Sequence, residues 1–279
     1  MTAASGPRAS SPRVVVITGA SDGIGAEMAR QLAAREGAGI ALVLAARNAV
    51  QLDMVAAECA AHKAQVLVVP TDVSVRIQCR RLAITAVERF GRIDVLVNNA
   101  GRSAHALFEE VEELDWYEEL MRVNLWGAIW CTQAALPHLK ATRGSIVAVS
   151  SLAGLVGVPG RTAYSATKFA MTGFFEALRA ELKGAGVSVT TAYPGVVATR
   201  IRYRGFNAQG EEAGASGLKE EGAMSVEECA RLIIAGMDAR KREVVMTAKG
   251  KVGRFLKLLA PGLVEKMALA ALADEHRPR

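Results

Sequence analysis

The sequence predicts an α/β fold in which helices cover both faces of a single doubly wound parallel sheet, as in Rossmann-like proteins. Three observations lead to this prediction: short apolar β-branched runs, longer Ala/Leu/Glu/Arg stretches between them, and a glycine-rich turn directly after the first run. Near-continuous apolar runs suit strands that are covered on both faces. Their alternation with helical patterns indicates βαβ units.

The expected elements run along the whole chain. Strands are predicted at 13–18, 40–45, 65–69, 93–97, 145–149, 187–193 and 243–246. Helices are predicted near 24–36, 48–61, 75–90, 114–140, 162–184 and 225–239. Two regions break this rhythm: residues 199–224 and the basic, amphipathic residues 249–274. Residues 199–224 are rich in glycine and charge, and a loop of this length is usually a lid, a binding loop or a disordered segment.

A single domain is expected. The chain has 279 residues, of which 51% are hydrophobic, and this is enough for one large core. No internal repeat or linker divides it. Residues 1–12 are expected to form a flexible tail, 13–248 the Rossmann-like domain with the lid 199–224, and 249–279 an amphipathic tail.

Composition and charge argue against several classes of protein. The formal net charge is +6, but the basic residues are scattered, which argues against a nucleic-acid partner. The four cysteines and four histidines are dispersed, so we expect reduced thiols and no metal site. No stretch is long and apolar enough to span a bilayer, and the run 14–17 is too short for a secretory signal. A cytoplasmic location is therefore expected.

Tyr164 and Lys168 form the most informative pair in the sequence. In a helix, residues four apart share one face, so the phenol and the ammonium would point the same way. A neighbouring cation stabilises a phenolate, and the hydroxyl of Ser151 is placed to hold a carbonyl oxygen against the phenol. The three residues together predict a device that gives a proton to an oxygen or takes one from it. A chance pair on a helix surface is the alternative.

The glycine-rich turn after the first strand predicts a phosphate site. Its glycines allow a tight turn and a close approach of the backbone, and the start of the next helix favours an anion. The spacing is not G-x-G-x-x-G, so a plain strand-to-helix turn is the alternative. The candidate residues of this turn are Gly19, Ser21, Asp22, Gly23, Ile24 and Gly25.

The end of the second strand favours NADP(H) as the cofactor. An NAD site requires an acidic residue there to bind the ribose 2′-hydroxyl, but the chain has Arg47 and no acid. A guanidinium binds a 2′-phosphate through charge-assisted hydrogen bonds. A solvated arginine is the alternative. Asp22 would repel a 2′-phosphate unless it pairs with Arg47.

Polar residues follow two further strands at the same edge of the predicted sheet. Asp72, followed by Val73, is placed to accept a hydrogen bond from an adenine amino group, with a helix N-cap as the alternative. Asn99, Ala100 and Gly101 follow the fourth strand, where ligands of open α/β sheets bind. A simple Asn/Gly turn is the alternative for these three residues.

Taken together, these residues resemble the short-chain dehydrogenase/reductase family. The ordered set is specific although each motif alone is weak. It covers roughly residues 13–199, and the resemblance is looser beyond. The matching positions are Thr18 to Gly25, Asp72, Asn98 to Gly101, Asn124, Ser151, Tyr164, Lys168, Pro194, Gly195 and Thr199.

The resemblance implies hydride transfer between a nicotinamide and a carbonyl or alcohol. It implies that Tyr164 is the general acid/base and that Lys168 stabilises the phenolate and binds the nicotinamide ribose. Ser151 would hydrogen-bond the substrate oxygen, and Asn124 would anchor a water relay to Lys168.

The resemblance further implies a nicotinamide contact and an assembly. Pro194, Gly195, Val197 and Thr199 would cover the carboxamide side of the ring, and a helix cap is the alternative for Thr199. Members of the family usually associate through the helices after Asn124 and through Tyr164, so we expect a homodimer or a homotetramer.

The substrate is expected to be a lipophilic ketone or aldehyde. The pocket should be walled by 102–108, 152–159 and the lid, and the stretch 152–159 is apolar without any charge. NADP⁺-dependent alcohol oxidation is one alternative. A nucleotide-sensing binding protein of the same fold is another, although such a protein does not need the Tyr164 device.

Two sets of basic residues remain. Arg200, Arg202 and Arg204 are expected to face water rather than an anionic substrate group. The tail from 249 places apolar stripes among lysines and is broken at Pro261. It is expected to pack on the core or on a neighbouring subunit; gating of the pocket and peripheral contact with an anionic membrane are the alternatives.

Overall fold

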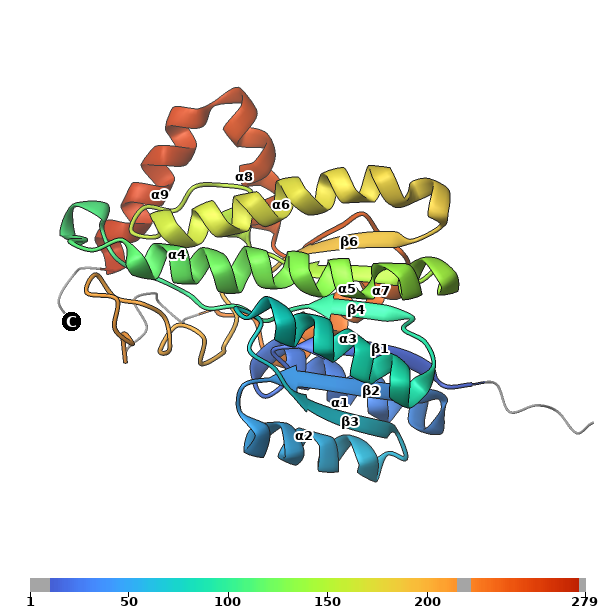
Figure 1. The fold of residues 1–279 in the computed structure, drawn as a ribbon. Helices are drawn as coiled ribbons and strands as arrows, with labels where there is room; N and C mark the ends of the chain where they lie inside the picture. The colour runs from blue at the N-terminus through green and yellow to red at the C-terminus, as the bar shows by residue number, and fades with distance from the viewer. Residues whose placement is uncertain (1–10, 215–221, 276–279) are drawn as a thin grey trace, which may run out of the picture.

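The computed structural model describes residues 11–214 and 222–275. Seven parallel strands of the described chain form one sheet in the order β3-β2-β1-β4-β5-β6-β7 (Figure 1). The chain thus moves outward from β1 in one direction and then from β4 in the other. The strands are β1 Arg13–Thr18, β2 Ile40–Ala46, β3 Gln65–Pro70, β4 Val95–Asn98, β5 Ser145–Val149, β6 Ser188–Tyr193 and β7 Glu243–Val245.

Helices cover both faces of this sheet, which confirms the predicted fold class. One face carries a core with α1 (Gly23–Glu36), α2 (Ala49–Ala61) and α7 (Val226–Asp238). The other face carries a second core with α3 (Arg76–Phe90), α5 (Gly127–Thr142) and α6 (Thr162–Leu182).

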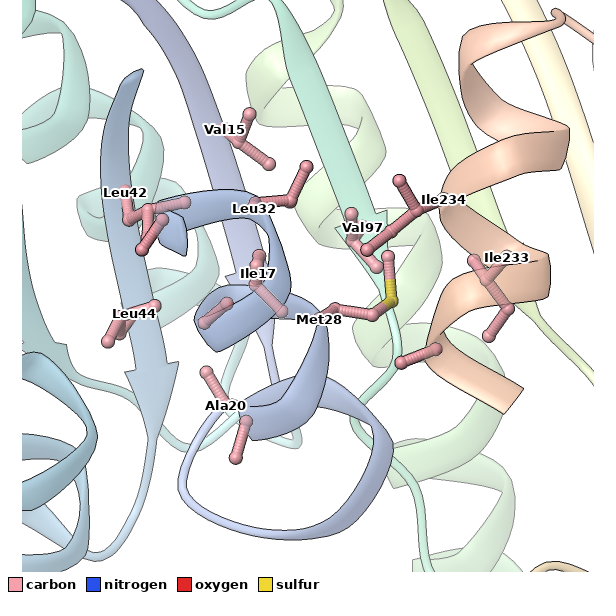
Figure 2. Packing of buried hydrophobic residues seen from close by; sticks show 14 of the residues in the cluster. Val15, Ile17, Ala20, Met28, Leu32, Leu42, Leu44, Val97, Ile233 and Ile234 are labelled. Carbon is pink, nitrogen blue, oxygen red and sulfur yellow. The ribbon is translucent and has the colours of Figure 1, made fainter. Parts of the chain in front are cut away.

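The alternation of side chains along the strands explains why the apolar runs are continuous. Val15 and Ile17 of β1 point into the first core, whereas Val14 and Val16 point into the second. Figure 2 shows Ile17 in the first core together with Met28 of α1. Each fully buried aliphatic side chain of this kind stabilises the fold by about 1.5–3 kcal/mol.

Side-chain caps set the starts of several helices. Asp22 accepts a hydrogen bond from the Gly23 amide at 2.7 Å at the start of α1. Asn48 accepts one from the Gln51 amide, so α2 begins one residue later than the predicted helix at 48.

The predicted helix at 114–140 is interrupted. It consists of α4 (Asp115–Met121), a π-helical turn at Arg122–Trp126, and α5. A π-turn inserts one extra residue into the helical ladder, and apolar periodicity does not reveal it. The turn contains Asn124, one of the predicted site residues.

Two helices, α8 (Ala248–Leu259) and α9 (Pro261–Glu275), follow the sheet and project from it (Figure 1). One side of α8 contacts the body. Arg254 pairs with Glu243, and the Lys257 ammonium donates to the Leu155 carbonyl at 3.1 Å. The expected packing on the core is therefore present on this side only.

The opposite side of the pair is apolar and exposed. Phe255 has 63% of its surface exposed and Leu259 has 85%. Val252, Leu263 and Met267 are exposed as well. None of the helices in the described ranges is both long enough and apolar enough to cross a bilayer.

Candidate active site

A cavity of about 830 Å³ opens at the carboxyl ends of the central strands. This is the edge where the chain direction reverses between β1 and β4, and ligands of open α/β sheets bind at such a point. Most of the predicted site residues line the cavity. They are Gly19, Ser21, Asp22, Gly23, Ile24, Arg47, Asp72, Val73, Asn99, Ala100, Gly101, Ser151, Tyr164, Lys168, Pro194, Gly195, Val197 and Thr199.

Gly25 and Asn124 do not line the cavity. A Cβ atom at Gly25 would collide with the Gly19 carbonyl oxygen, so this glycine allows α1 to pack closely on the turn. Gly19 itself has φ +65°, a conformation that side chains rarely adopt. The turn therefore requires glycine at both positions, at Gly19 for the backbone conformation and at Gly25 for the close contact.

Asn99 holds the glycine turn in place. Its side-chain amide donates to the carbonyl oxygens of Thr18 and Gly19 at 3.0 and 3.1 Å. In return, the Thr18 hydroxyl accepts hydrogen bonds from the backbone amides of Asn99 and Ala100. The loops after β1 and β4 are thereby joined, so Asn99 shapes the floor of the cavity through its side chain.

The charges at the outer end of the cavity differ from the expectation. Asp22 pairs with Arg204 at 3.1 Å and not with Arg47. Arg204 was expected to face water, and so was Arg202, which is only 8% exposed and donates to the Val197 carbonyl at 3.0 Å. The expectation is wrong for Arg202, because residues after Thr199 fold back over the cavity, whereas Arg204 keeps 51% of its side-chain surface exposed. The guanidinium of Arg47 has no ion pair or hydrogen bond within the described residues.

Asp72 forms a local turn rather than a helix cap. Its carboxylate accepts hydrogen bonds from the amide and the hydroxyl of Ser74, at 2.9 and 2.6 Å. The helix that follows, α3, begins only at Arg76 and has no side-chain cap. Asp72 still borders the cavity, next to Val73.

The three residues of the predicted proton device lie together. Ser151 follows β5, and its hydroxyl accepts a hydrogen bond from the Ala153 amide at 3.2 Å. Tyr164 and Lys168 lie in the first turns of α6, and the Lys168 ammonium is 5.7 Å from the centroid of the Tyr164 ring. All three border the same cavity.

Lys168 is a buried cation. Its ammonium donates to the Val149 carbonyl at 3.0 Å. Burial lowers the pKa of the Lys168 ammonium, the nearby Tyr164 raises it, and the nearby Arg161 lowers it further. The ammonium is thus held at the inner end of the cavity with few partners other than Tyr164.

Asn124 lies behind the cavity, fully buried in the π-turn. Its amide nitrogen donates to the Arg102 carbonyl at 2.9 Å and to the Thr167 hydroxyl at 3.0 Å. Its amide oxygen accepts from the Arg102 backbone amide at 2.8 Å. These bonds use both of its N–H groups, so Asn124 holds the loop after β4 against α6.

The segment after β6 forms one wall of the cavity. Thr199 does not cap a helix, because turns follow it over the described residues up to 214. A Cβ atom at Gly23 would lie 3.3 Å from the Thr199 side chain, so this wall closely approaches the glycine turn. Farther along, the Phe206 amide and carbonyl bond the backbone of Ser103 and His105.

The substrate end has both apolar and charged walls. Of the predicted stretches 102–108 and 152–159, only Arg102 and Ser103, then Leu152, Ala153 and Val158, reach the cavity. The predicted lid borders it through Thr199, Arg200, Ile201, Arg202, Arg204 and Glu212. Residues 155–157 do not, so the apolar wall is smaller than expected. The part of the predicted lid that lies at 215–221 is outside the described residues.

One residue beside Tyr164 was missed by the sequence analysis. Arg161 borders the cavity, and its guanidinium carbon lies 4.3 Å from the centroid of the Tyr164 ring. Its position three residues before Tyr164 is the only signal in the sequence.

Comparison with known proteins gives consistent matches. The family model of the short chain dehydrogenases matches residues 13–209. An 11-beta-hydroxysteroid dehydrogenase 1A from Arabidopsis thaliana is 36% identical over 261 residues, which cover 91% of this chain and 73% of that protein.

Two solved structures have the same fold. A short-chain dehydrogenase from Sphingobium yanoikuyae in complex with NADPH has a TM-score of 0.75 at 28% identity, covering 91% of this chain and 95% of that one. A short-chain dehydrogenase/reductase from Burkholderia phymatum in complex with NAD has a TM-score of 0.78 at 27% identity, with coverage of 90% and 95%.

The fold and the matches define an oxidoreductase with a Rossmann-like dinucleotide-binding architecture. The chain belongs to the short-chain dehydrogenase/reductase family. The family and the fold class that the sequence predicted are both confirmed.

The lowered pKa of Lys168 has a consequence for stability. The unfolded chain binds this proton more tightly than the folded one, so the free energy of unfolding rises with pH between the folded and the unfolded pKa. In Lys168→Met this contribution is absent. We expect its free energy of unfolding to rise less steeply toward about pH 10 than that of the wild type. Urea unfolding at several pH values measures this slope.

The matched control is Lys140→Met, which removes an exposed lysine of α5. It should keep the slope of the wild type. If the free energy of unfolding changed equally with pH in Lys168→Met and in the wild type, the pKa of Lys168 would not be lowered by folding.

Proposed function

We propose that this oxidoreductase uses NADP(H) and reduces a lipophilic ketone or aldehyde. The observation that carries the proposal is the meeting of Ser151, Tyr164 and Lys168 at the inner end of a cavity whose outer end is the glycine turn of α1. One end suits proton transfer to an oxygen and the other suits a phosphate.

The glycine turn and its surroundings fit a dinucleotide. Close approach of a ligand is possible because Gly19 and Gly23 carry no side chains, and the start of α1 favours an anion. Arg47 would hold the 2′-phosphate, and Asp72 with Val73 would contact the adenine. Pro194, Gly195, Val197 and Thr199 would cover the nicotinamide end. Asn99, Ala100 and Gly101 form the floor between them.

The choice of NADP(H) over NAD(H) depends on charge. No acidic residue follows β2, and Arg47 has no partner among the described residues. The carboxylate of Asp22 is offset by Arg204, which reduces its repulsion of a 2′-phosphate. The Sphingobium structure contains NADPH and the Burkholderia structure NAD, so this preference is a property of each chain's own residues.

The chain's own residues account for the proton and the orientation. When bound, the nicotinamide supplies the hydride. The Ser151 hydroxyl would donate a hydrogen bond to the substrate oxygen, which orients and polarises the carbonyl. The Tyr164 hydroxyl would donate its proton to the same oxygen, and the Lys168 ammonium would stabilise the phenolate left behind. NADP⁺-dependent alcohol oxidation is the reverse of these steps.

The lipophilic substrate is inferred from one wall of the cavity. Leu152, Ala153 and Val158 border it, together with Val196 and Ile201. The Arabidopsis relative is named for a hydroxysteroid, which is a lipophilic alcohol. We therefore propose a substrate of that size and polarity class.

We also propose that the chain is a cytoplasmic protein that assembles as a homodimer or homotetramer through α5 and α6. Trp126 is 46% exposed, and its ring stacks on that of Trp130 at 5.8 Å. Phe169 of α6 is partly exposed as well. A second copy of the chain would cover these aromatic rings.

The proposed role of Tyr164 is tested by Tyr164→Phe. We expect turnover of ketones with NADPH to fall by about 10²- to 10⁴-fold, because the variant has no proton to donate. The affinity for NADPH, measured by its fluorescence, should change little. Turnover equal to that of the wild type would exclude Tyr164 as the acid. Binding without turnover in the wild type, unchanged in the variant, would instead indicate a nucleotide sensor.

The proposed role of Arg47 is tested by Arg47→Asp. The carboxylate would repel a 2′-phosphate and bind a 2′-hydroxyl, so the ratio of kcat/KM for NADPH to that for NADH should fall by about tenfold or more. Arg231→Asp, on an exposed surface of α7, is the matched control for the change of charge. An unchanged ratio in Arg47→Asp would show that Arg47 does not select the cofactor.

The exposed apolar side of α8 and α9 leads us to propose peripheral contact with an anionic membrane. Apolar side chains there lie among Lys249, Lys251 and Lys266, and such a surface suits an interface between acyl chains and acidic headgroups. The remaining lysine of α8, Lys257, is bound to the body.

Co-sedimentation with vesicles that contain phosphatidylserine tests this contact. We expect the double variant Phe255→Glu, Leu259→Glu to bind at least about tenfold more weakly than the wild type. The matched control changes two exposed apolar residues of α2, Val50→Glu and Met54→Glu. Equal binding by all three proteins, or no binding by the wild type, would exclude the membrane contact.

A further inference from the structure

Arg161 and Lys168 place two positive charges around one phenol. Arg161 immediately precedes α6, and its guanidinium lies over the Tyr164 ring at 4.3 Å from the centroid. The Lys168 ammonium lies 5.7 Å from the same centroid. A guanidinium over an aromatic face is attracted by the ring's electrons, so Arg161 also restrains the orientation of the ring.

The guanidinium of Arg161 is fixed by the loop after β4. It donates to the Ser103 hydroxyl at 2.6 Å and to the Ala104 carbonyl at 3.2 Å. Ser103 is itself buried, and the Ala106 amide bonds the Gly160 carbonyl next to Arg161. The protein's own groups therefore hold the arginine in place beside the ring.

Two other arginines of this part of the cavity are directed elsewhere. Arg102 lies over the Phe206 ring at 3.6 Å and pairs with Glu119 and Glu212. Arg202 donates to the backbone of Val197. Among the described residues, the charged groups recorded over the Tyr164 ring are Arg161 and Lys168.

We propose that Arg161 is a positioning residue for Tyr164: it holds the ring in the cavity and supplies a second positive charge that supports the phenolate. The proposal rests on the proposed role of Tyr164 as the proton donor. A phenolate between two cations is more stable than one beside a single cation, and the fixed guanidinium requires no rearrangement during the reaction. Burial lowers the pKa of the Lys168 ammonium, and the charge of the same arginine lowers it further.

Arg161→Gln tests the proposal. Its amide can still bond the Ser103 hydroxyl, but the charge is lost. We expect kcat to fall by about 10- to 100-fold and the midpoint of its pH profile to move to higher pH, with an unchanged Kd for NADPH. Arg161→Lys keeps the charge and should restore the midpoint, with only partial recovery of kcat. A midpoint that stays at the wild-type pH in Arg161→Gln, or a lysine variant identical to the glutamine variant, would overturn the proposal.

Two further variants separate charge from structure. Arg231→Gln removes one positive charge from an exposed site on α7 and should leave the pH profile unchanged. Ser103→Ala removes one bond to the guanidinium but keeps its charge, so kcat should fall without movement of the midpoint. If Arg231→Gln moved the midpoint as far as Arg161→Gln, the effect would be one of net charge, and the assignment of Arg161 would be wrong.

A measurement without substrate keeps this test apart from the proposed function. Titration of ultraviolet tyrosinate absorbance, as the difference between a protein and its Tyr164→Phe counterpart, reports this phenol alone. The difference should titrate at higher pH in the Arg161→Gln background than in the wild-type background. If the wild type reduces no carbonyl, the proposed function is wrong. The titration still tests the role of Arg161, and an unchanged titration in the Arg161→Gln background would contradict that role.

Discussion

The burial of the Lys168 ammonium is the constraint on which the inner end of the cavity depends. A buried cation is costly unless it is partnered, and its partners here are the Val149 carbonyl, the Met171 sulfur and the neighbouring phenol. The chain keeps this charge where water solvates it poorly, so its field acts on Tyr164 with little screening. Asn124 and Thr167 fix the surrounding backbone, because α6 is held to the loop after β4 through their side chains. These bonds fix the geometry in which the proposed proton transfer would take place.

The fold was predictable because the two faces of the sheet impose the same requirement on every strand. Residues such as Val14 and Val15 must both be apolar when helices lie above and below them, and this leaves continuous runs in the sequence. The cavity edge was predictable for a related reason, since the residues that follow parallel strands meet at one edge. Nearly all predicted site residues consequently line one cavity, although they come from distant parts of the chain.

Three features escaped the sequence analysis, each for a physical reason. The π-turn around Asn124 changes the helix by one residue, and side-chain periodicity is too coarse to detect it. The Asp22–Arg204 pair joins the first glycine turn to a segment after Thr199, and local patterns carry no information on such long-range pairs. Arg161 looks like an ordinary basic residue at a helix start until Ser103, far away in sequence, is seen to hold it.

The packing of α1 on α7 bears on how the chain is made. Met28 of α1 shares a core with Ile233 and Ile234 of α7, and these two helices come from opposite ends of the chain (Figure 2). During synthesis the part of α1 that packs on α7 stays uncovered until the ribosome has passed residue 238, long after β1, β2 and β3 have emerged. Contacts of such high sequence separation slow folding and leave partly built sheets open to association. Completion of the core between α1 and α7 is therefore a late step of folding that requires nearly the whole chain.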